Sequence, residues 1–385
     1  MLNISNNQLY KTVDLKSFKS GKNIFSKEYY KALNKFLLIF AFIGLIALFL
    51  PWTQNISGKG LVTTLALGQR PQAIQSQIPG RIEQWFVREG DFVKKGDTIA
   101  IVSTARKVSK EELAPAIALV KSWGLKVFLG ISIEAEEHQY SGDDDLRTSD
   151  FQNMLDNPNI NAIWCARGGY GTVRIIDYLD YTKFINHPKW IIGYSDVTVL
   201  HSHIHQFGIE TLHAQMPVSI ETKSASTIKS IKKVLFGEDY SIEIFPDDNN
   251  IQGIASGQLI GGNLSILYSL CGSPSAINTQ GKILFIEDLD EYLYHIDRML
   301  QNLLRNDYFE GLEGLIVGGM TQMHDNDIPF GKNAAEMILD ICSGYDFPIT
   351  FNFPAGHLED NQALILGRKA DLMVNKNGVI LSFKE

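Results

Sequence analysis

The stretch KKGDTIAIVSTARKVSKEEL, from Lys94 to Leu113, decides how the chain divides into domains. Its centre, Ile99–Val102, is a short apolar run of the kind that forms a buried strand. The residues before this run read as the end of a small β domain, and those after it read as the start of an α/β body. One strand cannot easily complete both cores. We assign it to the α/β body, which has all its later elements. The junction at about 97–103 then reads as a fusion point, natural or an artefact of sequence assembly.

A helix and a second strand are predicted directly after this run. Ser109–Glu112 has the spacing of a capping box, apolar residues then recur at helical spacing, and Gly124 can end the helix. Pro115 is tolerated in the first turn of a helix and would bend it at a deeper position. An apolar run at 125–129 follows, so the spacing predicts a strand–helix–strand unit.

The rest of the chain continues the same alternation. Further strands are predicted at 162–166, 190–194, 282–286, 315–317 and 349–353. A polar stretch separates the first two of these strands from the last three. The sequence therefore predicts an α/β protein of two domains, 97–222 and 254–385, joined by a linker at 223–253.

Length and composition exclude several classes of protein. The chain has 385 residues, enough for two or three domains, and its 45% hydrophobic and 20% charged residues are typical of globular proteins. A formal net charge of -8 argues against nucleic acid as the main partner. The three cysteines are far apart and in no CxxC spacing, so we expect neither a disulfide framework nor a zinc knuckle.

The N-terminal part departs from this average. Residues 1–35 form a polar tail that carries seven lysines, and FLLIFAFIGLIALFLPW at 36–52 contains no charged residue. A run of this length fits the short end of a membrane span, and Trp52 suits the membrane interface. We therefore predict one transmembrane helix at 36–52, with the tail in the cytoplasm and the rest of the chain outside the inner membrane.

Residues 53–96 alternate apolar residues with turns at Pro79-Gly80, Glu89–Asp91 and Lys95–Asp97. This segment resembles the first half of a lipoyl/biotinyl-like β domain. With the preceding helix it resembles the start of a membrane-fusion (periplasmic adaptor) protein. The coiled-coil hairpin and the second half-motif of that family do not follow in the sequence. A non-enzymatic secretion adaptor is therefore an alternative that the sequence disfavours.

The sharpest candidate for chemistry is Ser195. An apolar strand ends in Gly193-Tyr194-Ser195-Asp196, and a helix with apolar periodicity begins there. A serine on a tight strand-to-helix turn presents its hydroxyl outward, beside free amides of the helix N-terminus that can stabilise an oxyanion. A serine that only caps the helix would give the same local pattern.

Two other motifs have a structural interpretation beside the functional one. Arg167–Gly171 places three glycines after a strand, which suits close backbone approach to a ligand or a bare turn, and it lacks the GK[ST] ending of a phosphate loop. His201 and His205 are four residues apart and could share a metal ion on a helix. No HExxH pattern accompanies them, so we expect no metal site.

A nucleophilic serine needs a base, and the base needs an orienting carboxylate. Acidic residues follow a predicted strand in Phe285–Glu291, and a histidine ends the similar stretch Phe353–His357. Each stretch alone is more typical of a solvated turn. In combination they supply the two groups that Ser195 lacks.

Together these motifs resemble the L,D-carboxypeptidase family of serine peptidases, which includes muramoyltetrapeptide carboxypeptidases and microcin-immunity peptidases. The resemblance covers about 97–385 and rests on ordered motifs at 100–106, 141–147, 167–171, 193–198, 257–264, 286–288, 296–298 and 356–357. It departs from the family at His213–Met216, which reads His-Ala-Gln-Met where relatives often have His-Gly-x-Met.

The resemblance implies a role for each candidate side chain. Ser195 would be the nucleophile, and His357 would be the general base and then the general acid. Glu287 would hold the imidazole in its productive tautomer, because the family glutamate directly follows the strand. Glu291 is a nearby competitor for that role if the turn is shifted.

The resemblance also implies the surroundings of these groups. The amides of Gly169 and Asp196 would form an oxyanion hole, with Gly168 beside them. The fold would be an N-terminal parallel-sheet α/β domain with the serine and a C-terminal α/β domain with the glutamate and histidine. The site would lie between the two domains, often in a homodimer. No metal ion or organic cofactor is implied.

The implied function is release of the terminal D-alanine from peptidoglycan tetrapeptides during wall recycling, by acyl transfer to the serine. An immunity peptidase that acts on a peptide–nucleotide conjugate is the alternative on the same scaffold. The family implies a cytoplasmic enzyme, whereas the predicted membrane helix implies an exported one. We therefore expect a cytoplasmic location if the N-terminal fusion is not genuine.

Overall fold

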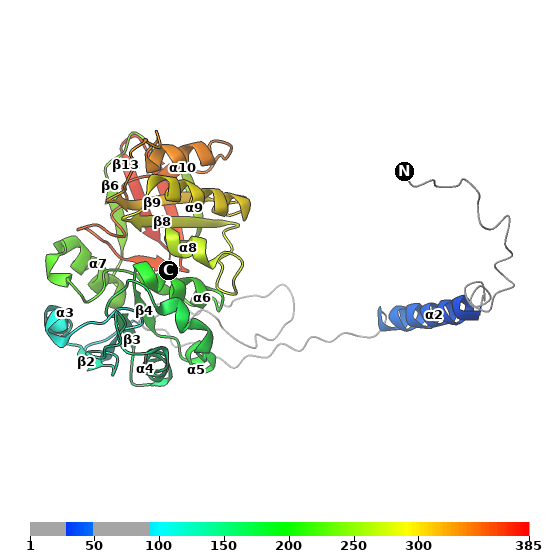
Figure 1. The fold of residues 1–385 in the computed structure, drawn as a ribbon, viewed down its shortest axis with the longest axis horizontal. Coiled ribbons are helices and arrows are strands. Elements are labelled where there is room, and N and C mark those ends of the chain that lie inside the picture. Colours follow the sequence, from blue (N-terminus) through cyan, green and yellow to red (C-terminus); the bar gives the residue numbers. More distant parts are fainter. Residues whose placement is uncertain (1–27, 49–91, 385) are drawn as a thin grey trace, which may run out of the picture. The chain divides into compact units, whose positions relative to one another are not determined.

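The computed structural model describes residues 28–48 and 92–384 (Figure 1). These residues belong to two separate units, 1–85 and 86–385. In the first unit the structure describes one helix, α2 (Glu28–Leu48). All the strands that the structure describes lie in the second unit.

The predicted membrane span at 36–52 is not supported. Within the described residues, no helix combines the length and the apolar composition needed to cross a membrane. Residues 49–52 of the predicted span lie outside the described residues. The predicted inner-membrane location rested on this span and is therefore not supported either.

The second unit alternates strands and helices along most of its length. The strands are β1 (Thr98–Val102), β2 (Lys126–Leu129), β3 (Ala162–Cys165), β4 (Trp190–Gly193), β5 (Thr211–His213), β6 (Ser241–Ile244), β7 (Gly253–Asn263), β8 (Lys282–Leu289), β9 (Gly314–Thr321), β10 (Ile349–Thr350), β11 (Leu364–Leu366), β12 (Lys369–Asn375) and β13 (Gly378–Phe383). The helices are α3 (Lys110–Ser122), α4 (Asp144–Asp156), α5 (Thr182–Asn186), α6 (Thr198–His205), α7 (Ala225–Leu235), α8 (Leu264–Leu270), α9 (Leu293–Arg305) and α10 (Ala334–Cys342). Short 3₁₀ turns lie at Thr172–Arg174, Ile176–Tyr178, Ser195–Val197 and Ile220–Thr222.

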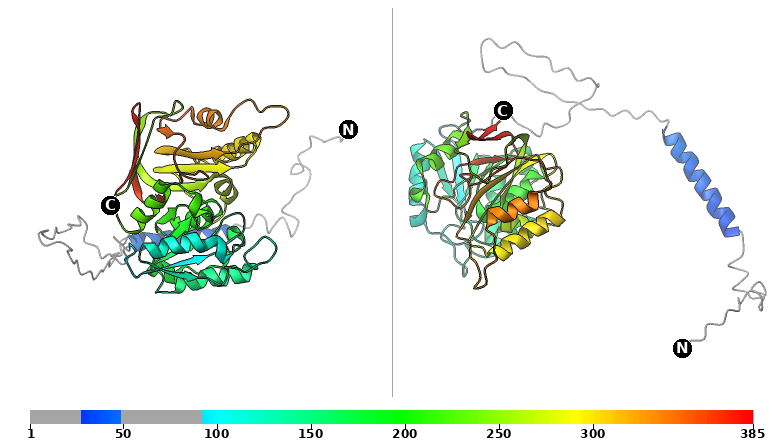
Figure 2. Two further views of the ribbon diagram at one scale, coloured as in Figure 1. Left: turned by 90° about the vertical axis from the view of Figure 1, so that its left-hand side faces the viewer. Right: turned by 90° about the horizontal axis from the view of Figure 1, so that it is seen from above.

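The strands form two sheets, one in each lobe of the unit (Figure 2). The first lobe contains a six-stranded sheet in the order β11-β5-β4-β3-β1-β2, in which β1 to β5 are parallel. The second lobe contains a seven-stranded sheet in the order β10-β9-β8-β7-β12-β13-β6. Its strands β7 to β10 are parallel, and β12, β13 and β6 extend it in antiparallel fashion. The predicted two-domain α/β fold is therefore confirmed.

Strand β1 belongs to the α/β body, as predicted, and lies between β2 and β3 in the first sheet. Its side chains alternate between two buried layers. Ile99 and Ile101 pack in the core beneath α3 and α7, whereas Ala100 and Val102 pack in the core formed with α4, α5 and α6. A parallel strand buried on both faces reads as an unbroken apolar run, which explains the sequence signal at this strand.

The residues just before β1 also pack on the body. Val93 is buried, and its amide donates a hydrogen bond to the carbonyl of Leu235 at 2.8 Å. The ring of Phe92 covers Gly237, where a Cβ would lie 2.4 Å from a ring carbon. The described part of the predicted β segment at 53–96, residues 92–96, therefore packs with the α/β body. The rest of that segment lies outside the described residues.

Two features of the body differ from the predicted division at 223–253. The polar linker contains the helix α7 and the strand β6. Strand β11, from the C-terminal part of the chain, pairs antiparallel with β5 and completes the edge of the first sheet. A strand of three residues carries too little periodicity to be assigned to a sheet from sequence.

The predicted capping box at the start of α3 is confirmed. Ser109 Oγ accepts a hydrogen bond from the amide of Glu112, and the Glu112 side chain accepts one from the amide of Ser109. Gly124 follows the helix with a φ of +82°, the left-handed conformation that favours glycine. Pro115 lies inside α3, beyond its first three residues.

We predict that Ser109→Ala lowers the free energy of unfolding by about 1 kcal/mol, the usual loss when a serine N-cap is removed. Urea denaturation followed by circular dichroism measures this change. Ser122→Ala is the matched control, because this exposed hydroxyl donates a hydrogen bond to the carbonyl of Leu119 in the last turn of the same helix. Equal losses in the two variants would contradict a special role for the cap.

Candidate active site

Ser195 lies on a tight turn between β4 and α6. Its φ is +61°, an uncommon left-handed conformation for a residue with a side chain. The turn needs Gly193, because a Cβ there would lie 2.8 Å from Cγ2 of Val197. No hydrogen bond from the Ser195 side chain caps a helix within the described part of the chain. The capping interpretation therefore fails, and the turn presents the hydroxyl to the cavity instead.

A buried histidine ties the turn to the sheet. His201 Nε2 lies 2.9 Å from the carbonyl oxygen of Gly193, and its Nδ1 lies 2.8 Å from Oγ1 of Thr211. A carbonyl can only accept, so Nε2 donates and Nδ1 accepts the hydroxyl proton of Thr211. Burial lowers the pKa of His201 to about 4, which keeps the ring neutral. Both nitrogens are occupied, so His201 is a structural residue.

The glycine-rich turn after β3 lies against Ser195. A Cβ on Gly168 would lie 3.3 Å from Cβ of Ser195, and Gly169 has a φ of +110°. Oδ2 of the buried Asp196 accepts the amide proton of Thr172 at 2.9 Å, directly after this turn. Burial raises the pKa of Asp196, although the hydrogen bonds from Thr172 act against it. The side chain of Asp196 thus joins the serine turn to the glycine-rich turn.

The second lobe supplies a histidine and a glutamate in direct contact. Nδ1 of His357 lies 2.7 Å from Oε2 of Glu287, which also accepts the amide proton of His357 at 3.1 Å. Glu287 is completely buried, near the end of β8. Gly356 allows this approach, because a Cβ there would lie 2.5 Å from Oε2 of Glu287. The carboxylate can only accept, so Nδ1 carries a proton and Nε2 is left available.

Burial and charge act in opposite directions on His357. Burial lowers its pKa, whereas the carboxylate of Glu287 raises it through charge and a hydrogen bond, and the net shift is upward. The neighbouring Asp288 is also buried, and burial together with the charge of Glu287 raises its pKa to about 7. Glu287 is therefore the main charged group that favours protonation of this imidazole.

Glu291, the alternative partner, is engaged elsewhere. Its Oε2 lies 2.5 Å from Nδ1 of His295, in the first turn of α9. The geometry thus places Glu287, not Glu291, against His357. Glu291 still lines the cavity in front of the histidine.

Asn263 belongs to the site, although its sequence motif predicts no role for its side chain. Its Nδ2 donates to Oδ1 of Asp288 at 3.0 Å and lies 3.3 Å from Oε1 of Glu287. Its backbone amide donates to Oγ1 of Thr198, at the start of α6 in the first lobe, at 3.0 Å. Gly262 also faces Thr198, because a Cβ there would lie 2.5 Å from Oγ1. The Gly-Gly-Asn sequence at 261–263, within the motif at 257–264, is the sequence signal for this contact.

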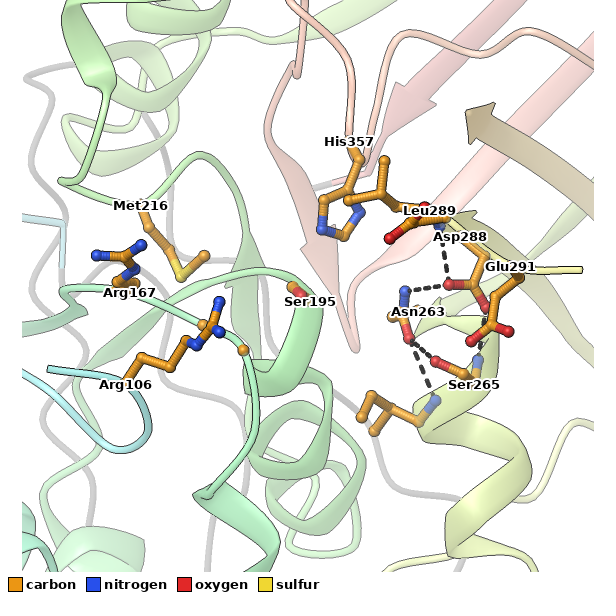
Figure 3. A pocket seen from close by; sticks show the side chains of 14 residues that line it. Arg106, Arg167, Ser195, Met216, Asn263, Ser265, Asp288, Leu289, Glu291 and His357 are labelled. Carbon is orange, nitrogen blue, oxygen red and sulfur yellow. Dashed lines mark hydrogen bonds between the residues drawn. The ribbon is translucent and has the colours of Figure 1, made fainter. Parts of the chain in front are cut away.

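The candidate residues of both lobes line one cavity of about 460 Å³ (Figure 3). The first lobe contributes Arg106, Arg167, Gly168, Gly169, Ser195 and Met216. The second lobe contributes Asn263, Ser265, Ile266, Asp288, Leu289, Asp290, Glu291 and His357. In Figure 3, Ser195 lies below the ring of His357, between Arg106 on one side of the space and Asn263 on the other.

The other histidines do not form a metal site among the described residues. No group of three or more histidine, cysteine, aspartate or glutamate side chains suited to a metal ion occurs there. His205 contacts Nζ of Lys282 at 2.9 Å, and burial lowers its pKa to about 4. His213, in the segment that departs from the family pattern, is buried between the rings of Tyr194 and Phe285.

Comparison with known proteins identifies the two lobes. Residues 99–214 match the LD-carboxypeptidase N-terminal domain, and residues 256–372 match the LD-carboxypeptidase C-terminal domain. A probable murein peptide carboxypeptidase of Bacillus subtilis is 34% identical over 289 residues, which cover 72% of this chain and 89% of the relative. A murein tetrapeptide carboxypeptidase of Pseudomonas aeruginosa is 27% identical and covers 72% of this chain and 94% of the relative.

Solved structures agree with these matches. A muramoyltetrapeptide carboxypeptidase from Oxalobacter formigenes superposes with a TM-score of 0.70 at 27% identity, over 75% of this chain and 99% of that one. A microcin C7 self-immunity protein of Escherichia coli is also a relative, 27% identical over 73% of this chain and 92% of its own length. The matched domains begin at residue 99, and the predicted adaptor segment before it is not supported.

We predict that Glu287→Gln lowers the pKa of His357. Burial of His357 opposes its protonation, and in the wild type the carboxylate of Glu287 outweighs this effect. Without that carboxylate, burial lowers the pKa of His357. Because the folded-state pKa lies above its unfolded value of about 6.5, this pair stabilises the fold below that pH. The stabilisation is lost as the pH rises through the folded-state pKa. NMR titration of the His357 ring protons measures the shift.

Glu291→Gln is the matched control for that titration, because it removes a carboxylate from the same cavity that contacts His295 and not His357. We expect His357 to titrate as in the wild type. A similar shift in both variants would mean that the general negative charge of the cavity, and not the contact with Glu287, sets the pKa of His357.

Proposed function

The chain belongs to the LD-carboxypeptidase family and is a serine-type carboxypeptidase, and we propose that it releases the terminal D-alanine from peptidoglycan tetrapeptides. The observation that carries this proposal is the approach of Ser195 and the His357–Glu287 pair to one cavity from two lobes. Nucleophile, base and orienting carboxylate are the groups that acyl transfer to serine requires.

In the proposed first step, the hydroxyl oxygen of Ser195 attacks the carbonyl carbon of the amide before the terminal D-alanine. Nε2 of His357 takes the hydroxyl proton and then transfers it to the leaving nitrogen as the carbon–nitrogen bond breaks. D-alanine leaves, and the peptide remains as an ester on Ser195. Water then attacks the ester with His357 again as the base, which restores the free serine.

Glu287 has two functions in this scheme. It accepts the Nδ1 proton of His357, which leaves the Nε2 lone pair free for the serine. Its negative charge stabilises the imidazolium that forms when His357 takes the proton. Complete burial makes this stabilisation strong, because little water screens the two charges.

We propose that backbone amides of the two turns stabilise the developing oxyanion, and we assign this role to the amides of Gly169 and Asp196. Gly169 has a left-handed backbone, and Asp196 directly follows the nucleophile on the strained turn. The hydrogen bond from Thr172 to Asp196 keeps the two turns together, so these donors are positioned before substrate arrives.

The murein-peptide relatives support a peptidoglycan peptide as substrate. The lining of the cavity bears on the alternative, a peptide–nucleotide conjugate. None of the lining residues that the structure describes is a tryptophan, tyrosine or phenylalanine. Aromatic stacking is a common means of holding a base, so this cavity favours a peptide. The predicted homodimer and the wall-recycling role stay predictions.

We predict that Ser195→Ala and His357→Ala abolish measurable D-alanine release from a murein tetrapeptide. Glu287→Gln should reduce kcat by about 10³–10⁴-fold, the scale of loss when the orienting carboxylate of a serine triad is neutralised. Release of D-alanine, measured with a coupled D-amino-acid oxidase assay on the purified full-length chain, gives these rates.

Glu291→Gln is the control in this assay as well, and we expect it to keep kcat within about tenfold of the wild type, because it leaves the His357–Glu287 contact intact. Undiminished release of D-alanine by Ser195→Ala would overturn the serine mechanism. An inactive wild type that hydrolyses a peptide–nucleotide conjugate would instead support the alternative substrate.

A further inference from the structure

The two lobes give the cavity walls of opposite charge. The first lobe places Arg106 and Arg167 on its wall beside the nucleophile. The second lobe places Asp288, Asp290 and Glu291 on the facing wall. The catalytic scheme above uses none of these five side chains.

The two arginines differ in their contacts. Nη1 of Arg167 lies 3.2 Å from a carboxylate oxygen of Glu112 and 3.4 Å from the carbonyl oxygen of Lys107. For Arg106, no ion pair or side-chain hydrogen bond occurs among residues 28–48 and 92–384. Figure 3 shows the side chain of Arg106 reaching toward the space between Met216 and Ser195. Arg106 is therefore the cation of this wall that lacks a protein partner in the described chain.

The backbone holds the Arg106 side chain in this place. Its methylene groups cross over Gly169, where a Cβ would lie 2.4 Å from Cδ and 2.7 Å from Cγ of Arg106. The preceding residue, Gly168, lies against Ser195, where a Cβ would lie 3.3 Å from the serine Cβ. Arg106 therefore crosses Gly169, the residue next to Gly168, and Gly168 contacts the nucleophile Ser195.

A carboxypeptidase must recognise a negative charge at a fixed distance from the bond it breaks. The α-carboxylate of the leaving residue is attached to the carbon that follows the scissile nitrogen, only two bonds from that nitrogen. A guanidinium binds a carboxylate through two parallel hydrogen bonds, with geometric as well as electrostatic selectivity. We propose that Arg106 binds the terminal carboxylate of the substrate and makes the enzyme selective for a free C-terminus. This inference rests on the proposed function.

The facing acidic wall strengthens the selectivity. Asp290 and Glu291 pair with His324 and His295 respectively, which fixes them on the side of the cavity opposite Arg106. A terminal carboxylate directed toward that wall would meet like charges, whereas one directed toward Arg106 meets a cation. The charge asymmetry therefore sets the direction in which a peptide enters, with its C-terminal residue on the arginine side.

The test compares one tetrapeptide with its C-terminal amide, which differs only in the charge that Arg106 is proposed to bind. For the wild type, we expect kcat/KM to be about 10–100-fold higher for the acid, the scale of one charge-assisted hydrogen-bonded pair. Arg106→Ala should lower kcat/KM for the acid by that factor and leave the amide nearly unchanged. Arg106→Lys should restore part of the preference, since it keeps the charge without the paired donors.

Arg305→Ala is the matched control, because it removes an exposed arginine at the end of α9 that does not line the cavity. We expect it to keep both the rate and the preference for the acid. Equal losses of kcat/KM on acid and amide in Arg106→Ala, or no preference in the wild type, would overturn the assignment.

Binding to the inactive Ser195→Ala protein separates this inference from the proposed function. Calorimetric titration with the acid and the amide should show tighter binding of the acid by a similar factor. That difference should disappear in the protein that carries both Ser195→Ala and Arg106→Ala. Failure of the wild type to release D-alanine would overturn the proposed function. Equal binding of acid and amide would overturn the role of Arg106.

Discussion

The contact between Thr198 and the backbone of Gly262 and Asn263 is the constraint on which the site depends. Thr198 begins α6, directly after the turn that carries Ser195, and its hydroxyl accepts the amide proton of Asn263 at 3.0 Å. The absence of a side chain at Gly262 lets the two lobes meet this closely. Because Asn263 pairs in register with Glu287 on the neighbouring strand, the same contact sets the distance between the nucleophile and the base.

A second constraint is electrostatic. A completely buried Glu287 is costly unless its charge is compensated, and the ring and backbone donors of His357 compensate it. The same carboxylate keeps one ring proton on Nδ1, so the interaction that makes its burial tolerable also prepares the histidine to act as a base. The first lobe carries the strain of the serine turn, and the second carries the buried charge. Neither lobe alone contains the complete site.

The sequence predicted the elements whose signals are local. The apolar run at 99–102, the capping box at Ser109 and the serine turn each depend on residues close together in the chain, and each has the predicted structure. The sequence could not show that β11 completes the first sheet. It also could not show that Asn263 connects Glu287 and Asp288 to Thr198 in the first lobe. Those contacts connect residues far apart in the chain. A local signal can also mislead. The apolar run at 36–52 predicted a membrane helix, and no helix among the described residues meets the length and composition that a membrane span needs.

The most direct test of the central claim is covalent labelling with a fluorophosphonate, which reacts with a serine hydroxyl that a neighbouring base has activated. Peptide mapping by mass spectrometry would locate the adduct in a preparation that releases D-alanine. The account predicts one labelled residue, Ser195, with labelling slowed by Glu287→Gln and unaffected by Glu291→Gln. An active preparation that is labelled at another residue, or not labelled at Ser195, would contradict it.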